Sequence, residues 1–317
     1  MRGETVFMFS GQGSQYFQMG RELHLENATF RRWMARLDEI ARPLVGESIV
    51  SAIYAENRGK GDRFDRTLLT HPAIFMVEYA LAQTLIEAGV TPDVVLGVSL
   101  GSFVAASLAE SLTVDDALAA VIAQAKILEE RCERGGMLAV LHDPKLYDDD
   151  VLRQSELAAI NFASHFVVSA PDAALGTIEA LLRQRNIAHQ RLPVSFPFHS
   201  RWIEGAQQPF LAAMQMLRPR APRLPIACAE RATSVTQIDG DYFWGVVRRP
   251  MRFRETIARL EAEGPRRYID VGPSGTLATF LRYGILGDSR SSAHPILTPF
   301  GGDRKNLSAL LSAVPVH

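Results

Sequence analysis

The sequence predicts an α/β fold in two parts, one of residues 1–130 and 199–317 and a smaller one of residues 131–198. In the first part, short apolar segments alternate with helical patterns, which is typical of α/β domains. The G-V-S-L-G segment of residues 97–101 lies between an apolar strand and a helix, as in a hydrolase nucleophile turn. The smaller part has a β-α-β-β-α-β rhythm. We therefore expect an α/β-hydrolase-like large domain with an inserted ferredoxin-like subdomain.

The elements of the larger domain are predicted from apolar periodicity and turn residues. The first strand ends at a Gly-rich turn, and a second strand leads directly into Ser99. Strands are expected at 5–9, 94–97, 224–227 and 267–271, and helices at 27–44, 71–88, 102–110, 114–133, 210–217, 241–247 and 253–262.

The middle of the chain changes rhythm, because strands and helices there are shorter and follow one another in the split βαβ order. Its edges are expected near residues 130 and 198. Strands are predicted at 137–141, 157–162, 166–170 and 189–194, and helices at 144–153 and 173–185.

Composition limits the classes of protein to which this chain can belong. Its 317 residues are 47% hydrophobic and carry a formal net charge of −1, so nothing attracts the whole chain to nucleic acid or to a membrane surface. Two cysteines form no framework of bridges, and no apolar run is long enough to span a bilayer. No histidines or cysteines have metal-ligand spacing. We expect a reduced, soluble, cytoplasmic protein without a metal site.

The turn around Ser99 carries the strongest chemical signal. A serine hydroxyl is a poor nucleophile, so it must be exposed on a sharp turn and given a base. The small residues two positions before and after it let strand and helix pack closely. The turn also places the amide of Leu100 at a helix N-terminus, where it can donate to an oxyanion.

Two further segments are candidates for the rest of the site. The G-Q-G-S-Q segment of residues 11–15 follows a strand, and its Gln12 offers an amide that can line a pocket. It lacks the Lys-Ser/Thr ending of a phosphate loop. His199 lies between aromatic and small residues at a domain edge, but His165 and His71 remain rivals for the role of base.

Together these motifs resemble a known family. G-Q-G-S-Q, G-V-S-L-G, F-H-S at residues 198–200 and I-D-V-G-P at 269–273 occur in that order, together with D-Y-F-W and R-P-M-R-F between them. The chain is similar over its whole length to malonyl-CoA:acyl carrier protein transacylases and to the acyltransferase domains of polyketide synthases. Among these it most resembles the stand-alone acyl hydrolases of trans-acyltransferase pathways.

The resemblance implies a Ser-His dyad that works through an acyl-enzyme. Ser99 would attack a thioester while His199 accepts its proton, and Gln12 and the amide of Leu100 would bind the oxyanion. A main-chain carbonyl would orient the histidine, which makes Asp270 structural rather than a third triad member. No cofactor is bound. The phosphopantetheine of an acyl carrier protein, or coenzyme A, enters as part of the substrate.

The departures from the family concern the acyl pocket. Gln124 stands where malonyl-specific relatives have an arginine that pairs with the free carboxylate. Arg131 or Arg134 could replace that arginine only if the alignment slipped by two to three turns. Val98 replaces a histidine and Ser102 an acidic residue, which makes the mouth of the pocket less polar.

The predicted substrate-binding residues are therefore Gln124, Val98, Phe198 and Asn161, and the acyl group is expected to be uncharged.

Four functions remain open at this stage. The first is an acyl hydrolase that removes stalled acyl units from carrier proteins, and the second is a transferase for uncharged acyl groups. A malonyl transferase with a rearranged carboxylate site and a non-catalytic docking protein are the others. An acidic carrier protein is the expected partner of each, steered by arginines such as Arg201, Arg248 and Arg249.

Overall fold

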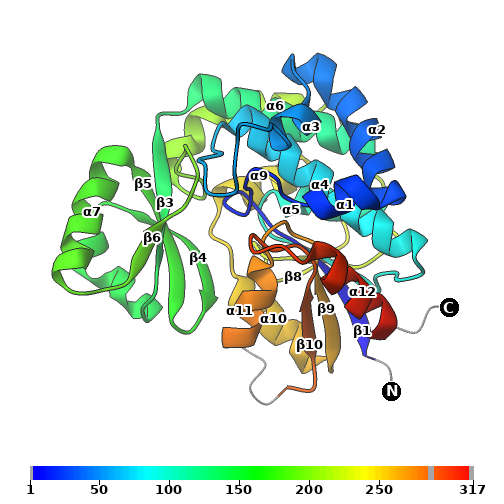
Figure 1. Cartoon of the computed structure of the whole chain (residues 1–317). Coiled ribbons are helices and arrows are strands. Elements are labelled where there is room, and N and C mark those ends of the chain that lie inside the picture. Colours follow the sequence, from blue (N-terminus) through cyan, green and yellow to red (C-terminus); the bar gives the residue numbers. More distant parts are fainter. Residues whose placement is uncertain (1–2, 285–288, 314–317) are drawn as a thin grey trace.

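The computed structural model describes residues 3–284 and 289–313, which form two sheets flanked by helices (Figure 1). The larger sheet has the strand order β10-β9-β1-β2-β7-β8. All neighbouring strands pair parallel except the last two, because β8 runs antiparallel to β7. They are β1 (Glu4–Phe9), β2 (Val94–Gly97), β7 (Ile226–Cys228), β8 (Thr233–Val235), β9 (Arg266–Asp270) and β10 (Ser292–Pro295).

The parallel register brings three loops to one edge of the larger sheet. Phe9 of β1 lies beside Gly97 of β2, and Met8 lies beside Asp270 of β9. The segments that follow these strands therefore emerge together, and they include Gln12 and Ser99. The carboxyl edge of a parallel sheet is where α/β proteins usually bind ligands.

Helices cover both faces of the larger sheet (Figure 1). The hydrophobic helix α4 is buried around most of its circumference, because it packs between α2 and α6. The main helices are α2 (Ala28–Val45), α4 (Thr67–Glu87), α5 (Gly101–Leu108), α6 (Val114–Arg131), α8 (Gln207–Met214), α9 (Gly240–Arg248) and α10 (Phe253–Ala262). Those that the sequence analysis missed are the short α1 (Arg21–Glu26) and α3 (Ile49–Ile53), with α11 (Thr276–Gly284) and α12 (Asp303–Ala313).

The smaller sheet is antiparallel, with the order β4-β5-β3-β6. It comprises β3 (Gly135–Val140), β4 (Glu156–Phe162), β5 (His165–Pro171) and β6 (His189–Arg191), and α7 (Asp172–Gln184) packs on β3 and β5. All of these elements lie within residues 131–198.

The predicted helix at 144–153 is wrong. Two 3-10 turns stand in its place, η1 (Pro144–Asp148) and η2 (Asp150–Leu152). Asp143 accepts a hydrogen bond from the amide of Lys145, and Asp149 accepts one from the amide of Val151. These two local caps compete with a continuous helix and divide the segment into two tight turns.

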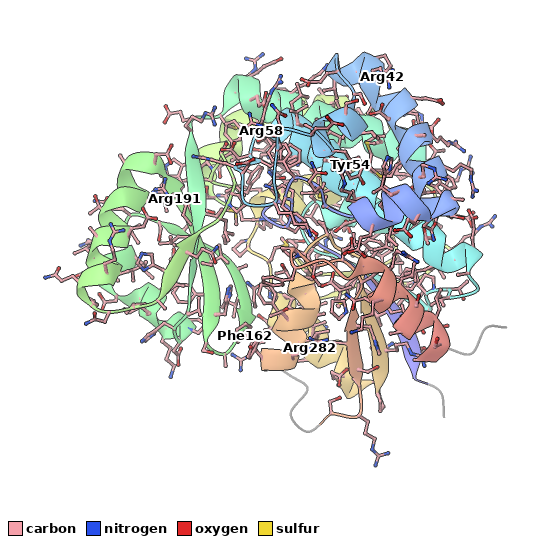
Figure 2. All side chains as sticks on the ribbon, in the orientation of Figure 1. Arg42, Tyr54, Arg58, Phe162, Arg191 and Arg282 are labelled. Carbon is pink, nitrogen blue, oxygen red and sulfur yellow. The ribbon has the colours of Figure 1, made fainter. Side chains whose placement is uncertain are left out.

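Contacts of β4 help to join the smaller sheet to the larger part. The amide of Met251 donates to Ala158 of β4, and the amide of Ile160 donates back to Met251. Farther along β4, the rings of Phe162 and Phe280 lie 5.9 Å apart. Figure 2 shows Phe162 at the tip of β4, beside the helix α11 that carries Arg282. The first of these contacts fixes the loop that follows α9.

Candidate active site

Ser99 lies on a sharp turn between β2 and α5. Its φ angle is 53°, in the left-handed region that non-glycine residues seldom adopt. Only glycine fits two positions before and two positions after Ser99. A Cβ atom at Gly97 would lie 2.5 Å from Ser102 Cα, and one at Gly101 would lie 2.2 Å from the Phe9 carbonyl oxygen. The close packing of strand and helix therefore holds the serine in its strained geometry.

His199 is the histidine that meets this serine. Its Nε2 atom lies 3.0 Å from Ser99 Oγ, and its Nδ1 atom lies 2.9 Å from the carbonyl oxygen of Arg249. Because a carbonyl only accepts, Nδ1 carries the proton and Nε2 is free to accept the serine proton. His199 also has a left-handed backbone, with φ of 60°. Ser99 and His199 thus have the geometry of a nucleophile and its general base.

Backbone hydrogen bonds hold the segment that presents the Arg249 carbonyl. The Arg249 amide donates to the carbonyl of Gly245 at 2.8 Å, and its guanidinium contacts the buried carboxylate of Glu230 at 3.1 Å. Met251, two residues further along the chain, is hydrogen-bonded to β4. The imidazole is therefore oriented by a main-chain carbonyl, as the resemblance implied, and the structure identifies that carbonyl as the one of Arg249.

The protonation state of His199 suits a base at neutral pH. Burial lowers the pKa of His199 to about 4; the hydrogen bond to the Arg249 carbonyl opposes this change, and the nearby charge of Arg248 adds to it. Because burial disfavours the charged form, the imidazole is neutral at pH 7 and stays neutral as the pH is lowered well below 7. It can accept a proton as soon as substrate binds.

The Leu100 amide is free to donate to an oxyanion near Ser99, and Gln12 lies close to the same serine. The amides of Gly101 and Ser102 donate to the carbonyls of Val98 and Ser99, whereas the amide of Leu100 has no acceptor among residues 3–284 and 289–313. Gly11 approaches so closely that a Cβ atom there would lie 2.9 Å from Ser99 Cβ, which places Gln12 next to the nucleophile. A free amide at a helix start is the usual oxyanion donor.

Thr70 holds the Gln12 side chain, a role that no sequence pattern indicated. Gln12 Nε2 donates to the Thr70 hydroxyl at 2.7 Å, while Gln12 Oε1 is buried and meets no donor in the described part of the chain. Gln15 fixes the rest of the loop, since its amide donates to the carbonyls of Phe64 at 2.9 Å and Pro193 at 2.7 Å. The loop is therefore held by both parts of the fold.

Asp270 does not reach the histidine. Its carboxylate accepts hydrogen bonds from the amides of Gly272 and Ala278, at 2.9 and 2.8 Å. Burial raises the pKa of Asp270 to about 6, although those backbone hydrogen bonds oppose the rise. The carboxylate thus joins the end of β9 to α11, which is a structural position.

Neither rival histidine hydrogen-bonds to the Ser99 hydroxyl among the described residues. His165 pairs with Asn161, whose Nδ2 lies 3.1 Å from His165 Nδ1 near the tip of the β4–β5 hairpin. Asn161 is thereby engaged within the smaller sheet and is not brought to Ser99 by any hydrogen bond among the described residues. His71 lies on α4, where its ring contacts Phe198 at 5.5 Å between centroids.

The predicted acyl-pocket residues differ in their surroundings. Gln124 is 2% exposed on α6, and its Oε1 atom has no partner among the residues that the structure describes. Phe198 is buried next to His199, and Val98 is half-buried next to Ser99. Arg131 and Arg134, by contrast, are both exposed. Neither replaces the charge that Gln124 lacks.

Comparison with known proteins decides the family. The acyl transferase domain matches residues 6–300. The chain belongs to the acyl transferase domain family. Over 316 residues it is 43% identical to the polyketide biosynthesis acyltransferase homolog BaeD of Bacillus velezensis, covering 99% of this chain and 98% of that protein. It is 42% identical to the homolog PksD of Bacillus subtilis, with 98% and 96% covered.

Solved structures of the family share the fold. The acyltransferase domain from the second module of the salinomycin polyketide synthase is 31% identical with a TM-score of 0.85, and the match covers 99% of this chain and 73% of that one. The MCAT structure from Streptococcus pneumoniae is 25% identical with a TM-score of 0.81, covering 98% of this chain and 100% of that one. The α/β architecture is therefore that of acyltransferase domains.

The arginines expected to steer an acidic carrier protein are already paired. Arg201 contacts Glu156 at 2.8 Å, Arg248 contacts Glu204 at 2.7 Å, and the third, Arg249, contacts Glu230. These carboxylates neutralise most of the local positive charge. The described part of the chain also contains no helix long and apolar enough to cross a membrane.

Proposed function

We propose that this acyltransferase-family protein is an acyl hydrolase that removes stalled, uncharged acyl units from acyl carrier proteins during polyketide biosynthesis. The observation that carries the proposal is the buried, neutral Gln124 on α6. The likeness to the polyketide biosynthesis homologs BaeD and PksD supports the pathway. The substrate supplies its own phosphopantetheine arm, so the reaction requires no bound cofactor or metal.

The first half of the proposed reaction loads Ser99. Its Oγ attacks the thioester carbonyl as its proton passes to Nε2 of His199, 3.0 Å away. The Leu100 amide and Gln12 receive the developing oxyanion. When the tetrahedral intermediate collapses, the C–S bond breaks, and His199 returns its proton to the departing thiol of the carrier protein. The products are the holo carrier protein and an acyl ester on Ser99.

The second half discharges the ester to water. His199, neutral again, accepts a proton from a water molecule that attacks the same carbonyl. Collapse of the second tetrahedral intermediate returns that proton to Ser99 Oγ and releases the carboxylic acid. The hydrogen bond from Nδ1 to the Arg249 carbonyl stabilises the imidazolium formed in both halves.

The charge of the acyl pocket supports the choice of an uncharged substrate. Among the described residues Arg266 is the one buried arginine, and it pairs with Glu4 and Glu263 at β9. A malonyl carboxylate brought into the site would therefore lose its water without gaining a cationic partner, which costs several kcal/mol. Acetyl, butyryl and longer neutral chains avoid that cost.

A transferase for uncharged acyl groups is the second candidate, favoured by the acyltransferase homologs themselves. It differs from the hydrolase only in the nucleophile that attacks the acyl-enzyme. We include in the proposal the carrier protein as partner and the division into an α/β-hydrolase-like domain and an inserted ferredoxin-like subdomain. The order β4-β5-β3-β6 supports that division.

Mass spectrometry of acyl-loaded carrier proteins tests this function. Acetyl, butyryl, longer acyl and malonyl loads are incubated with the protein, with Ser99→Ala as control and empty holo carrier protein as competing acceptor. Loss of neutral acyl groups as free acids, with malonyl retained, supports the hydrolase. Transfer of the acyl group to the empty carrier protein, or efficient malonyl turnover, would contradict it.

A further inference from the structure

A cavity of about 670 Å³ lies where the larger part of the fold meets the smaller sheet. The start of α4, the end of α6 and the segment between β6 and His199 form its walls. Its lining includes Thr67, Cys132, Arg134 and Phe196. Neither Ser99 nor His199 lines it, so the proposed reaction leaves this cavity without a role.

Two buried polar side chains on α4 lead from this cavity toward the dyad. Thr67 lines the cavity, and its hydroxyl has no hydrogen-bond partner among the described residues. Both ring nitrogens of His71 are likewise buried and unpaired in that part of the chain. The two residues are four apart, so they lie on one face of the helix, about 6 Å apart along its axis. Unpaired buried polar groups are rare enough to require an explanation.

Aromatic rings also lie between the cavity and the dyad. The ring of His71 lies 5.5 Å from that of Phe198, which precedes His199. The ring of Phe198 lies 6.3 Å from that of Phe196, which lines the cavity. Thr67, His71, Phe196 and Phe198 are all buried, and this packed set of side chains between His199 and the cavity is called the route below.

We propose that the cavity is the distal end of the acyl-binding channel and takes the far part of long acyl chains that carry neutral oxygen groups, such as hydroxyls. The inference rests on the proposed function only in that Ser99 must carry the acyl group. It deepens that function by assigning the substrate class, namely partly elongated, oxygenated chains as well as short ones.

The polar groups along the route match a hydroxyl rather than a charge. Burial lowers the pKa of His71 to about 3, so its ring is neutral at pH 7 and offers one donor and one acceptor. A hydroxyl group on the acyl chain can likewise donate one hydrogen bond and accept others, and so can the Thr67 hydroxyl. Beyond them, the cavity is lined by Arg134, whose guanidinium can donate hydrogen bonds to the oxygenated end of a chain.

Blocking the cavity tests the route. Cys132 lines it and is half-buried, so Cys132→Trp fills it without touching the dyad. Ser308→Trp, on an exposed turn of α12, is the matched control. Formation of acyl-Ser99 is followed by intact-protein mass spectrometry with butyryl and twelve-carbon acyl carrier proteins. We expect Cys132→Trp to slow loading of the long chain about tenfold or more, and butyryl loading less than twofold.

A second variant tests the oxygen preference. Thr67→Val keeps the shape and removes the unpaired hydroxyl. It should slow loading of a twelve-carbon chain with a mid-chain hydroxyl by about three- to tenfold, leave the unsubstituted chain unchanged, and leave the thermal midpoint unchanged or higher. A purely structural hydroxyl would instead lower the midpoint and affect both chains alike.

Equal loading of long chains by Cys132→Trp and the wild type would overturn the inference. Because the readout is acylation of Ser99, this result would not depend on whether water or a thiol later removes the acyl group. Failure of the hydrolase proposal would appear separately, as an acyl-Ser99 that persists in water and transfers to holo carrier protein.

Discussion

Replacing Gln124 with arginine should shift the acyl preference of this protein from neutral acyl groups toward malonyl. The side chain at this position is 2% exposed and uncharged. On the proposal that Gln124 lines the acyl pocket, the wild-type protein receives a malonyl carboxylate without a cationic partner. A lost charge-assisted hydrogen bond in a buried site is worth about 3 kcal/mol, or roughly a hundredfold in rate. We therefore expect the wild type to load butyryl onto Ser99 about a hundredfold faster than malonyl.

Gln124→Arg should reverse much of that ratio. The guanidinium can pair bidentately with the malonyl carboxylate, which we expect to raise malonyl loading about a hundredfold. With butyryl the new charge stays buried and unpaired, so loading of that group should fall about tenfold. The assay is intact-protein mass spectrometry of acyl-Ser99 after brief exposure to each acyl thioester.

Gln124→Met is the matched control, because it has a similar size and no charge. Its loading ratio should remain within about threefold of the wild type. Thermal unfolding of each variant shows whether it is folded. A folded Gln124→Arg with an unchanged loading ratio, or a wild type that loads malonyl as fast as butyryl, would refute the electrostatic argument.

Three further predictions concern the dyad and its supports. Burial lowers the pKa of His199 to about 4, so kcat/KM should stay constant as the pH is lowered and fall only near pH 4. A pH–rate profile that already falls near pH 6.5 would contradict this. Thr70→Val should lower kcat about tenfold by freeing Gln12, without changing the acyl preference; stopped-flow acylation with two acyl groups checks both. The Arg249–Glu230 contact involves a largely exposed guanidinium, so Arg249→Ala should cost less than about threefold in kcat. A larger loss would mean that this ion pair holds the carbonyl.

The sequence was most informative where a local rule has one structural solution. The glycines around Ser99 predict a strand, a tight turn and a helix, and backbone approaches of 2.2–2.5 Å to a Cβ atom show why no other residue fits. The alternation of strands in the middle of the chain likewise predicts the second sheet. Both patterns are contained within short segments.

The sequence was least informative where the structure depends on long-range contacts. The carbonyl that orients His199 belongs to Arg249, fifty residues away, and any residue type presents the same group. Thr70 binds Gln12 across fifty-eight residues and reads locally as part of a helix. The helix expected at 144–153 failed for the opposite reason, because two aspartate caps within the segment outweigh its helical periodicity.

The fate of the acyl group on Ser99 tests the central claim most directly. Ser99 is loaded with butyryl, separated from the acyl donor, and divided between buffer alone and buffer with excess holo carrier protein. Intact-protein mass spectrometry then follows both the enzyme and the carrier protein. We expect butyryl-Ser99 to disappear at the same rate in both samples and to yield free butyrate. An ester that is stable in buffer and reappears as butyryl carrier protein would contradict it.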